Sequence, residues 1–355
     1  MDTLTIRKPD DWHVHIRDGA MLEAVLPFTA RVFKRAIVMP NLSPDPITTT
    51  ERLLAYRDRI RKAAGTSGFT PLMTYYLTDD SSPDEIAKGF IDGIAVAVKL
   101  YPAGATTNSA NGVSDISKAY PVLAKMQEAG MPLLVHGEAL KDAAGNDVAL
   151  ADREKVFLDS TLPHLLKDFP SLKIVLEHAT TKDAIDFVRG DQSGRLASTI
   201  TVHHLILNKD DVEASAHSPY FYCMPVIKSE ADQKALRGAA TSGDPHFFLG
   251  TDSAPHPEPA KHAEKPAAGV FTAPAALELY AEVFEEEGQL ENLEAFASLN
   301  GPRFYGLPAN EEKITLKKET WTVDSLVRTA DGADIRPFGY HADPAKRLPI
   351  GWKLA

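Results

Sequence analysis

Two histidines near the N-terminus, His13 and His15, are the first residues whose spacing could do chemistry. If residues 11–16 form a β-strand, side-chain alternation puts both imidazoles on one face, where they can converge on a single point. Two convergent imidazoles are half of a metal site. A His-x-His pair alone is more often two polar residues at a strand end, so the rest of the chain decides between these interpretations.

Further reactive side chains come at or near the ends of short apolar runs. His136 follows Leu-Leu-Val, His178 follows Val-Leu-Glu, and Asp252 follows Leu-Gly-Thr. Each has an ordinary structural explanation, because a histidine can be a hydrogen-bonded core residue and Asp252 can cap a turn. Together with the first pair, four histidines and an aspartate on one rim suit zinc or another imidazole-preferring divalent metal.

Lys99 lies inside the apolar pattern Val-Ala-Val-Lys-Leu-Tyr. A buried ammonium is costly unless it is paired, neutral or reaches water along its stem, and the last explanation suffices for a lone lysine. A buried lysine with a lowered pKa can instead react as the free amine with CO2. The product is a carbamate, whose two oxygens can bridge two metals.

The elements that position these residues alternate along the chain. Strand patterns are predicted at 11–16, 35–39, 70–77, 94–101, 131–136, 172–178, 198–204 and 246–250. Helical patterns are predicted at 50–64, 83–93, 116–129, 152–169, 182–189, 230–240 and 274–287. This alternation predicts an α/β fold, a single (β/α)8 TIM barrel over residues 1–355. The proline-rich stretch 308–355 predicts a short irregular extension packed on the barrel.

Active sites of such barrels lie at the carboxyl ends of the strands. The reactive residues fall there, on several different strands: His13, His15, Asn41, Lys99, His136, His178 and Asp252. His203 and His204, at the predicted end of the seventh strand, are expected to be structural or to support the site.

Composition limits the partners. The net charge of −11 over 355 residues argues against nucleic acid and anionic membranes, because phosphate binding needs a basic face. The single cysteine, Cys223, excludes an internal disulfide and a cysteine-rich zinc site, and is expected to be a small buried residue. With no membrane-length apolar run and no leader pattern, a cytoplasmic location is expected.

Several local strings together resemble one enzyme family. They include His-Val-His-Ile-Arg-Asp, Met-Pro-Asn, Val-Lys-Leu-Tyr-Pro, Val-His-Gly-Glu, Glu-His-Ala-Thr-Thr and Gly-Thr-Asp-Ser-Ala-Pro-His. In this order they resemble the amidohydrolase superfamily, and within it the shorter, bacterial monofunctional dihydroorotases. The resemblance runs from the first strand to about residue 308. It implies reversible, zinc-dependent cyclisation of N-carbamoyl-L-aspartate to L-dihydroorotate in pyrimidine biosynthesis, by a homodimer.

The resemblance also implies roles for individual residues. The implied metal ligands are His13, His15, Lys99, His136, His178 and Asp252. Two zinc ions per subunit would be bridged by carboxylated Lys99 and a hydroxide, and Asp252 would transfer the proton. The implied substrate contacts are His15, Arg17, Asn41, His136, Met224, His256 and Ala268. Thr106 and Thr107 would lie on a flexible loop that closes over the site.

Three alternatives stay open. A hydantoinase-like or dihydropyrimidinase-like enzyme would share the metals. Its uncharged substrate, however, has no carboxylate for Arg17 and Asn41 to bind, which argues against this alternative. A metal-free barrel aldolase could use Lys99 as a Schiff-base nucleophile, but this leaves four histidines unexplained. A non-enzymatic scaffold would have no need for all six ligand positions.

Overall fold

The computed structural model describes residues 2–215 and 218–355. Within these ranges, eight parallel strands form one sheet, in which each strand pairs with the next along the chain. The strands are β2 (Asp10–Val14), β3 (Arg35–Val38), β4 (Thr70–Tyr76), β5 (Ala97–Leu100), β6 (Leu133–His136), β7 (Ile174–Glu177), β8 (Leu196–Ile200) and β9 (Phe247–Leu249).

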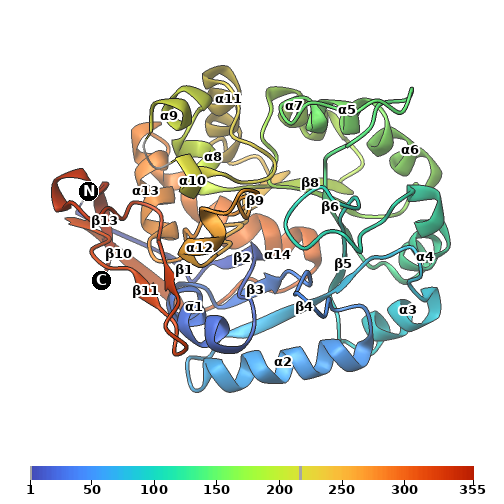
Figure 1. Ribbon diagram of the computed structural model, residues 1–355, viewed down its shortest axis with the longest axis horizontal. Coiled ribbons are helices and arrows are strands. Elements are labelled where there is room, and N and C mark those ends of the chain that lie inside the picture. Colours follow the sequence, from blue (N-terminus) through green and yellow to red (C-terminus); the bar gives the residue numbers. More distant parts are fainter. Residues whose placement is uncertain (1, 216–217) are drawn as a thin grey trace.

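The sheet closes on itself. Val14 forms a parallel bridge with Ser253, just beyond β9, and the His15 amide nitrogen lies 3.0 Å from the Ser253 carbonyl oxygen. Figure 1 shows the helices arranged around the outside of these strands. The predicted (β/α)8 barrel is therefore confirmed, although every observed strand is shorter than predicted at one end or both.

The helices in the described ranges are α1 (Gly19–Val32), α2 (Thr50–Ala64), α3 (Pro83–Ile91), α4 (Ile116–Ala129), α5 (Arg153–Asp159), α6 (Thr161–Asp168), α7 (Lys182–Gly190), α8 (Val202–Ile206), α9 (Lys209–Ala214), α10 (Ser218–Phe221), α11 (Glu230–Ala240), α12 (Glu258–Lys261), α13 (Ala276–Glu286) and α14 (Asn300–Tyr305). Three short helical turns accompany them: η1 (Leu290–Asn292), η2 (Ala295–Leu299) and η3 (Pro344–Lys346). In the described part of the chain, none of these helices combines the length and apolar character needed to cross a membrane.

Two predicted elements were wrong in part. The single helix at 152–169 is two helices that meet at Ser160, because Pro163 cannot donate to the Asp159 carbonyl and its ring would clash there. The seventh barrel strand ends at residue 200, and the Thr201 side chain caps α8 by accepting from the His204 amide. His203 and His204 therefore lie on a helix and not at a strand end.

The C-terminal extension is not irregular. β10 (Lys313–Thr322) pairs antiparallel with β1 (Thr3–Arg7) and with β13 (Pro349–Leu354), and β11 (Val327–Arg328) pairs with β12 (Asp334–Ile335). Figure 1 shows this sheet beside α13, which β13 contacts. Through β13, the extension contacts α13, one of the helices around the barrel. One of the two partners of β10 is β1, at the other end of the chain, so no local pattern indicates that pairing.

The barrel interior is filled by side chains from nearly every barrel strand and from α14. This cluster consists of Trp12, Ile37, Met39, Ala97, Leu134, Val175, Ala197, Phe248 and Phe304. Trp12 stacks on Tyr305 of α14, with ring centroids 4.5 Å apart, so α14 lies against the end of the barrel opposite the site. The interior below the site is thus a packed core that supports the residues above it.

Truncating this core should destabilise the whole barrel. Leu134 is fully buried on β6, so Leu134→Ala is expected to lower the free energy of unfolding by about 2–5 kcal/mol, through lost burial and a cavity. The shift in the midpoint of urea unfolding measures this loss. The matched control is Leu150→Ala, since Leu150 is exposed and its truncation should change stability by less than about 0.5 kcal/mol. Equal shifts for both variants would contradict a tightly packed interior.

Candidate active site

The predicted site residues come together at the carboxyl ends of the barrel strands. One pocket there is lined by His13, His15, Arg17, Asn41, Tyr101, Thr106, Thr107, His136, His178, Met224, Asp252, Ala254, Ala268 and Gly269. Two predicted residues lie just outside this lining. Lys99 is buried behind Tyr101, and His256 contacts Arg17 and Ala268 at the pocket wall.

The metal-binding candidates form a tight buried cluster. Asp252 Oδ1 lies 3.3 Å from His13 Nε2 and 3.1 Å from His15 Nε2. On the other side, His136 Nδ1 lies 3.2 Å from His178 Nε2. One ligand atom each from His13, His178 and Asp252 lie within 4.8 Å of one another, a spacing that can hold a metal ion.

Three residues of the site have a strained backbone conformation. Arg17, His178 and Asp252 have positive φ angles of 57°, 44° and 43°, a left-handed conformation that is unfavourable for residues other than glycine. His178 directly follows β7, while Arg17 and Asp252 each lie three residues after the end of a barrel strand. Non-glycine residues in this conformation are concentrated at functional sites, because the surrounding structure must hold them there.

Lys99 is the most unusual member of the cluster. Its side chain is completely buried, and its ammonium has no hydrogen-bond partner in the described residues. Nζ lies 4.9 Å from the centroid of the Tyr101 ring. Burial lowers the pKa of Lys99 to about 8, so the reactive free amine is accessible near neutral pH. Because Lys99 is completely buried, its side chain does not reach water, as an ordinary lysine in an apolar strand would.

The charges in the cluster suit cation binding. Burial lowers the pKa of His15 to about 3 and that of His178 well below its usual range, so both imidazoles are neutral. Burial alone would raise the pKa of Asp252, but neighbouring His13 and His15 hold it well below its usual value. Neutral imidazoles and an ionised carboxylate are the forms that bind metals.

Two buried glutamates orient the histidines, and the sequence analysis missed both. Glu177 Oε2 lies 2.8 Å from His13 Nδ1, and it also accepts a hydrogen bond from Thr199. Glu138 Oε2 lies 2.6 Å from His136 Nε2. Carboxylates in this position fix the ring orientation and tautomer of a ligating histidine. An acid inside the buried strand pattern Val-Leu-Glu-His was the available signal for Glu177.

Polar groups on the other side of the pocket suit an anion. Arg17 Nη2 lies 2.9 Å from His256 Nε2, which is also 3.0 Å from the Ala268 carbonyl oxygen. One imidazole nitrogen cannot both accept from Arg17 and donate to Ala268. Thr107 contacts this region, since its carbonyl accepts from Asn41 Nδ2 at 3.1 Å and its hydroxyl accepts from the Ala268 amide at 2.9 Å. Thr106 and Thr107 therefore belong to the wall of the pocket.

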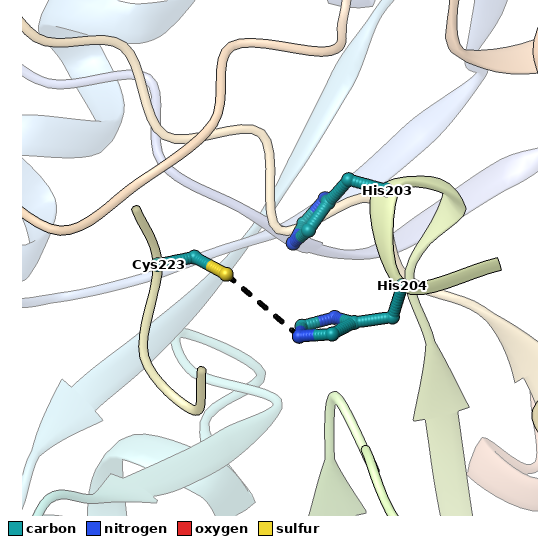
Figure 2. Close-up of side chains that lie close together, drawn as sticks. All are labelled: His203, His204 and Cys223. Carbon is teal, nitrogen blue, oxygen red and sulfur yellow. Dashed lines mark hydrogen bonds between the residues drawn. The ribbon is translucent and has the colours of Figure 1, made fainter. Parts of the chain in front are cut away.

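A second buried group of possible metal ligands consists of His203, His204 and Cys223, and Figure 2 shows the contact between the Cys223 thiol and the His204 ring. His204 Nδ1 lies 2.6 Å from the Thr201 hydroxyl, and Nε2 lies 3.1 Å from the Pro225 carbonyl oxygen. The Cys223 thiol donates to the same carbonyl, and burial raises its pKa to about 12. These hydrogen bonds fix the positions of His204 and Cys223, while the structural or supporting role of the two histidines stays a prediction.

The chain matches known proteins over most of its length. Residues 10–323 match the model of the amidohydrolase family. A dihydroorotase from Vibrio vulnificus is 56% identical over 323 residues, which cover 91% of this chain and 93% of the relative. A dihydroorotase from Azoarcus is 50% identical and both chains are covered completely.

Solved structures agree with these matches. A dihydroorotase from Saccharomyces cerevisiae in complex with 5-fluoroorotic acid superposes with a TM-score of 0.90 at 36% identity, covering 100% of this chain and 99% of that one. A dihydroorotase from Campylobacter jejuni gives a TM-score of 0.87 at 37% identity, covering 100% and 98%. L-hydantoinase from Arthrobacter aurescens shares the fold, with a TM-score of 0.79 at 17% identity over 99% and 83%. The chain therefore belongs to the amidohydrolase family and, within it, to the dihydroorotases.

Proposed function

We propose that this protein is a binuclear zinc dihydroorotase, which interconverts N-carbamoyl-L-aspartate and L-dihydroorotate with loss or gain of water in pyrimidine biosynthesis. The observation that carries this proposal is the buried cluster of histidines, Asp252 and Lys99, which lies beside the polar pair Arg17 and His256. The high identity to dihydroorotases over nearly the whole chain supports the same substrate.

One zinc ion would be held by His13, His15 and Asp252, and the second by His136 and His178. Lys99 would bridge them after its amine attacks CO2, which forms an N–C bond and releases one proton. The buried Nζ supports this step, because it has no hydrogen-bond partner in the described residues. As a carbamate, the side chain would be an anion that the two metal ions could bind. When bound, the two ions supply a nucleophile at neutral pH and polarise the ring carbonyl.

Asp252 would move the proton. Its neighbours His13 and His15 keep it ionised, so it can accept a proton during hydrolysis of the ring amide. It would then donate that proton to the departing ring nitrogen. In the biosynthetic direction the same carboxylate takes the proton from the attacking nitrogen and assists the loss of water.

The substrate carboxylate would bind Arg17, Asn41 and His256. A carboxylate between Arg17 and His256 would accept from both, which resolves the competition for the one imidazole nitrogen. His15 and His136 would face the reacting end of the substrate. Backbone groups of Met224 and Ala268 would contact the amide edge of the pyrimidine ring. Thr106 and Thr107 would close over the bound substrate.

The direct test is interconversion of L-dihydroorotate and N-carbamoyl-L-aspartate by the purified protein, before and after metal removal, with hydantoin and dihydrouracil as comparison substrates. We expect the enzyme to turn over dihydroorotate but neither comparison substrate. This activity should be lost when a chelator removes the metal and should return when zinc is added. Turnover of only the uncharged rings would favour a hydantoinase-like enzyme and overturn the carboxylate clamp. Borohydride trapping of a carbonyl substrate on Lys99 would favour the aldolase instead.

Removing the Arg17 guanidinium should weaken substrate binding. Arg17→Met is expected to lower kcat/KM for L-dihydroorotate by about 10- to 100-fold, because a charge-assisted hydrogen bond is lost. Arg59→Met is the matched control, since Arg59 pairs with half-buried Asp18, and neither residue lines the pocket. Steady-state kinetics on both variants measure the effect. An unchanged KM in Arg17→Met would remove Arg17 from carboxylate binding.

We also propose a cytoplasmic homodimer, as the family resemblance implies. Light scattering during size-exclusion chromatography should give twice the mass of one chain, and a monomer mass would contradict this part of the proposal.

A further inference from the structure

Lys261, the last residue of α12, is a buried lysine that the proposed mechanism does not use. The residue is only 4% exposed. Its ammonium donates to three backbone carbonyl oxygens, those of Tyr222 at 3.1 Å, Ala267 at 2.9 Å and Gly269 at 2.7 Å. An ammonium has three N–H donors, so all of them are used. No carboxylate in the described residues forms an ion pair with it.

The three carbonyls belong to two segments that are far apart in the sequence. Tyr222 lies two residues before Met224, while Ala267 and Gly269 flank Ala268 on both sides. The Gly269 amide also donates to the Tyr222 carbonyl, at 2.9 Å. The ammonium therefore lies at the junction of the two backbone segments that contact the ring in the proposed function.

The second segment has little room to adjust. A Cβ added to Gly269 would lie 2.6 Å from the Ala254 side chain and 2.7 Å from the Ala254 carbonyl oxygen, and the residue has a φ of +149°. The segment thus packs directly on the chain that follows Asp252. The Ala254 amide also donates to the Val270 carbonyl at 2.9 Å, and the hydrogen bonds of Lys261 join this segment to the one that carries Tyr222.

This arrangement is expensive, which argues against an incidental role. An ammonium without a carboxylate partner is costly to bury, and burial lowers the pKa of Lys261 to about 8. An apolar side chain of similar length would avoid that cost. It would, however, leave three carbonyls without this donor and the two segments joined by fewer contacts.

We infer that Lys261 is a positioning residue for substrate recognition, which sets the spacing between the backbone groups of Met224 and Ala268 and so fixes the pyrimidine ring edge that the site accepts. This inference rests on the proposed function, because that function assigns the two backbone contacts. Lys261 touches neither the metal ligands nor the reacting atoms in this arrangement. Its effect is therefore expected on binding and not on the chemical step.

The test compares Lys261→Met, Lys261→Arg and the control Lys173→Met in the full-length, zinc-loaded enzyme. Lys173 also donates to a backbone carbonyl, that of Phe304 at 2.7 Å, but on the face of the barrel away from the site. Lys261→Met should raise KM for L-dihydroorotate about tenfold, with kcat changed less than about threefold and the zinc content unchanged. Lys261→Arg should recover part of the loss, and Lys173→Met should keep the wild-type KM.

Hydrogen exchange gives a readout that does not depend on activity. The backbone amides of residues 222–224 and 267–269 should exchange faster in Lys261→Met than in the wild type and in Lys173→Met. An unchanged KM in Lys261→Met would overturn the positioning role. So would a rise in KM that is accompanied by comparable falls in kcat and in zinc content. If Lys261→Met fails to fold, Lys261→Gln, which keeps two N–H donors, decides by the same criteria. Failure of the proposed function is distinct, since the wild-type enzyme would then not turn over L-dihydroorotate.

Discussion

Asp252→Asn is expected to lower kcat for L-dihydroorotate about a thousandfold while most of the zinc stays bound. Asparagine has the same shape and keeps one ligand oxygen, so metal binding loses a charge but not a donor. It cannot, however, accept the proton that the reaction must move. Steady-state kinetics together with zinc analysis of the same preparation measure both effects.

Asp10→Asn is the matched control for Asp252→Asn. Asp10 is also a buried aspartate, but it begins β2 at the opposite end of the barrel, where Arg35 Nε donates to it at 2.9 Å. Removing its charge should lower stability and leave kcat of the folded enzyme unchanged. If Asp252→Asn retains activity, Asp252 does not transfer the proton. If it loses the zinc along with activity, its main role is that of a ligand.

Lys99→Met should have an effect of similar size by a different route. Methionine fills the same buried space, but it cannot form a carbamate. We expect bound zinc to fall from two ions per subunit to about one, and kcat/KM to fall about a thousandfold, because several kcal/mol of metal stabilisation are lost. The control is Lys228→Met, since Lys228 is also buried but donates to the Val226 carbonyl away from the ligands.

Carbon dioxide gives an independent check on Lys99. Apoprotein reconstituted with zinc in CO2-free buffer should recover little activity, and bicarbonate should restore it in the wild type but not in Lys99→Met. Equal recovery with and without bicarbonate would exclude carboxylation, even if the lysine proves essential. The two experiments thus separate the need for Lys99 from the need for its carbamate.

The barrel and the rim residues could be predicted because their signals are local. Each strand and each helix has its own periodicity, and parallel strands bring their carboxyl ends together at one rim. His13, His136 and His178 each come at or near the end of such a strand, so their convergence followed from the fold class alone. The specific roles came from the resemblance to dihydroorotases.

The features that were missed depend on contacts across the chain. The role of Glu177 depends on its hydrogen bonds to His13 and Thr199, which come from other strands. The positive φ angles of His178 and Asp252 reflect how tightly the chain must turn at the rim, which no local pattern records. Lys261 looks like an ordinary basic residue in the sequence, since its acceptors are carbonyls that every residue carries.

The pairing of β1 with β10 has a consequence for synthesis. Thr5 and Thr315 are partners across this pair, 310 positions apart. At ribosomal speeds of about 5–20 residues per second, β1 must wait roughly 15–60 s after it is made before its partner exists. During that time its backbone offers an open edge to any other nascent chain. Slow translation should therefore increase aggregation of this protein, and chaperones that shield the N-terminal strand should reduce it.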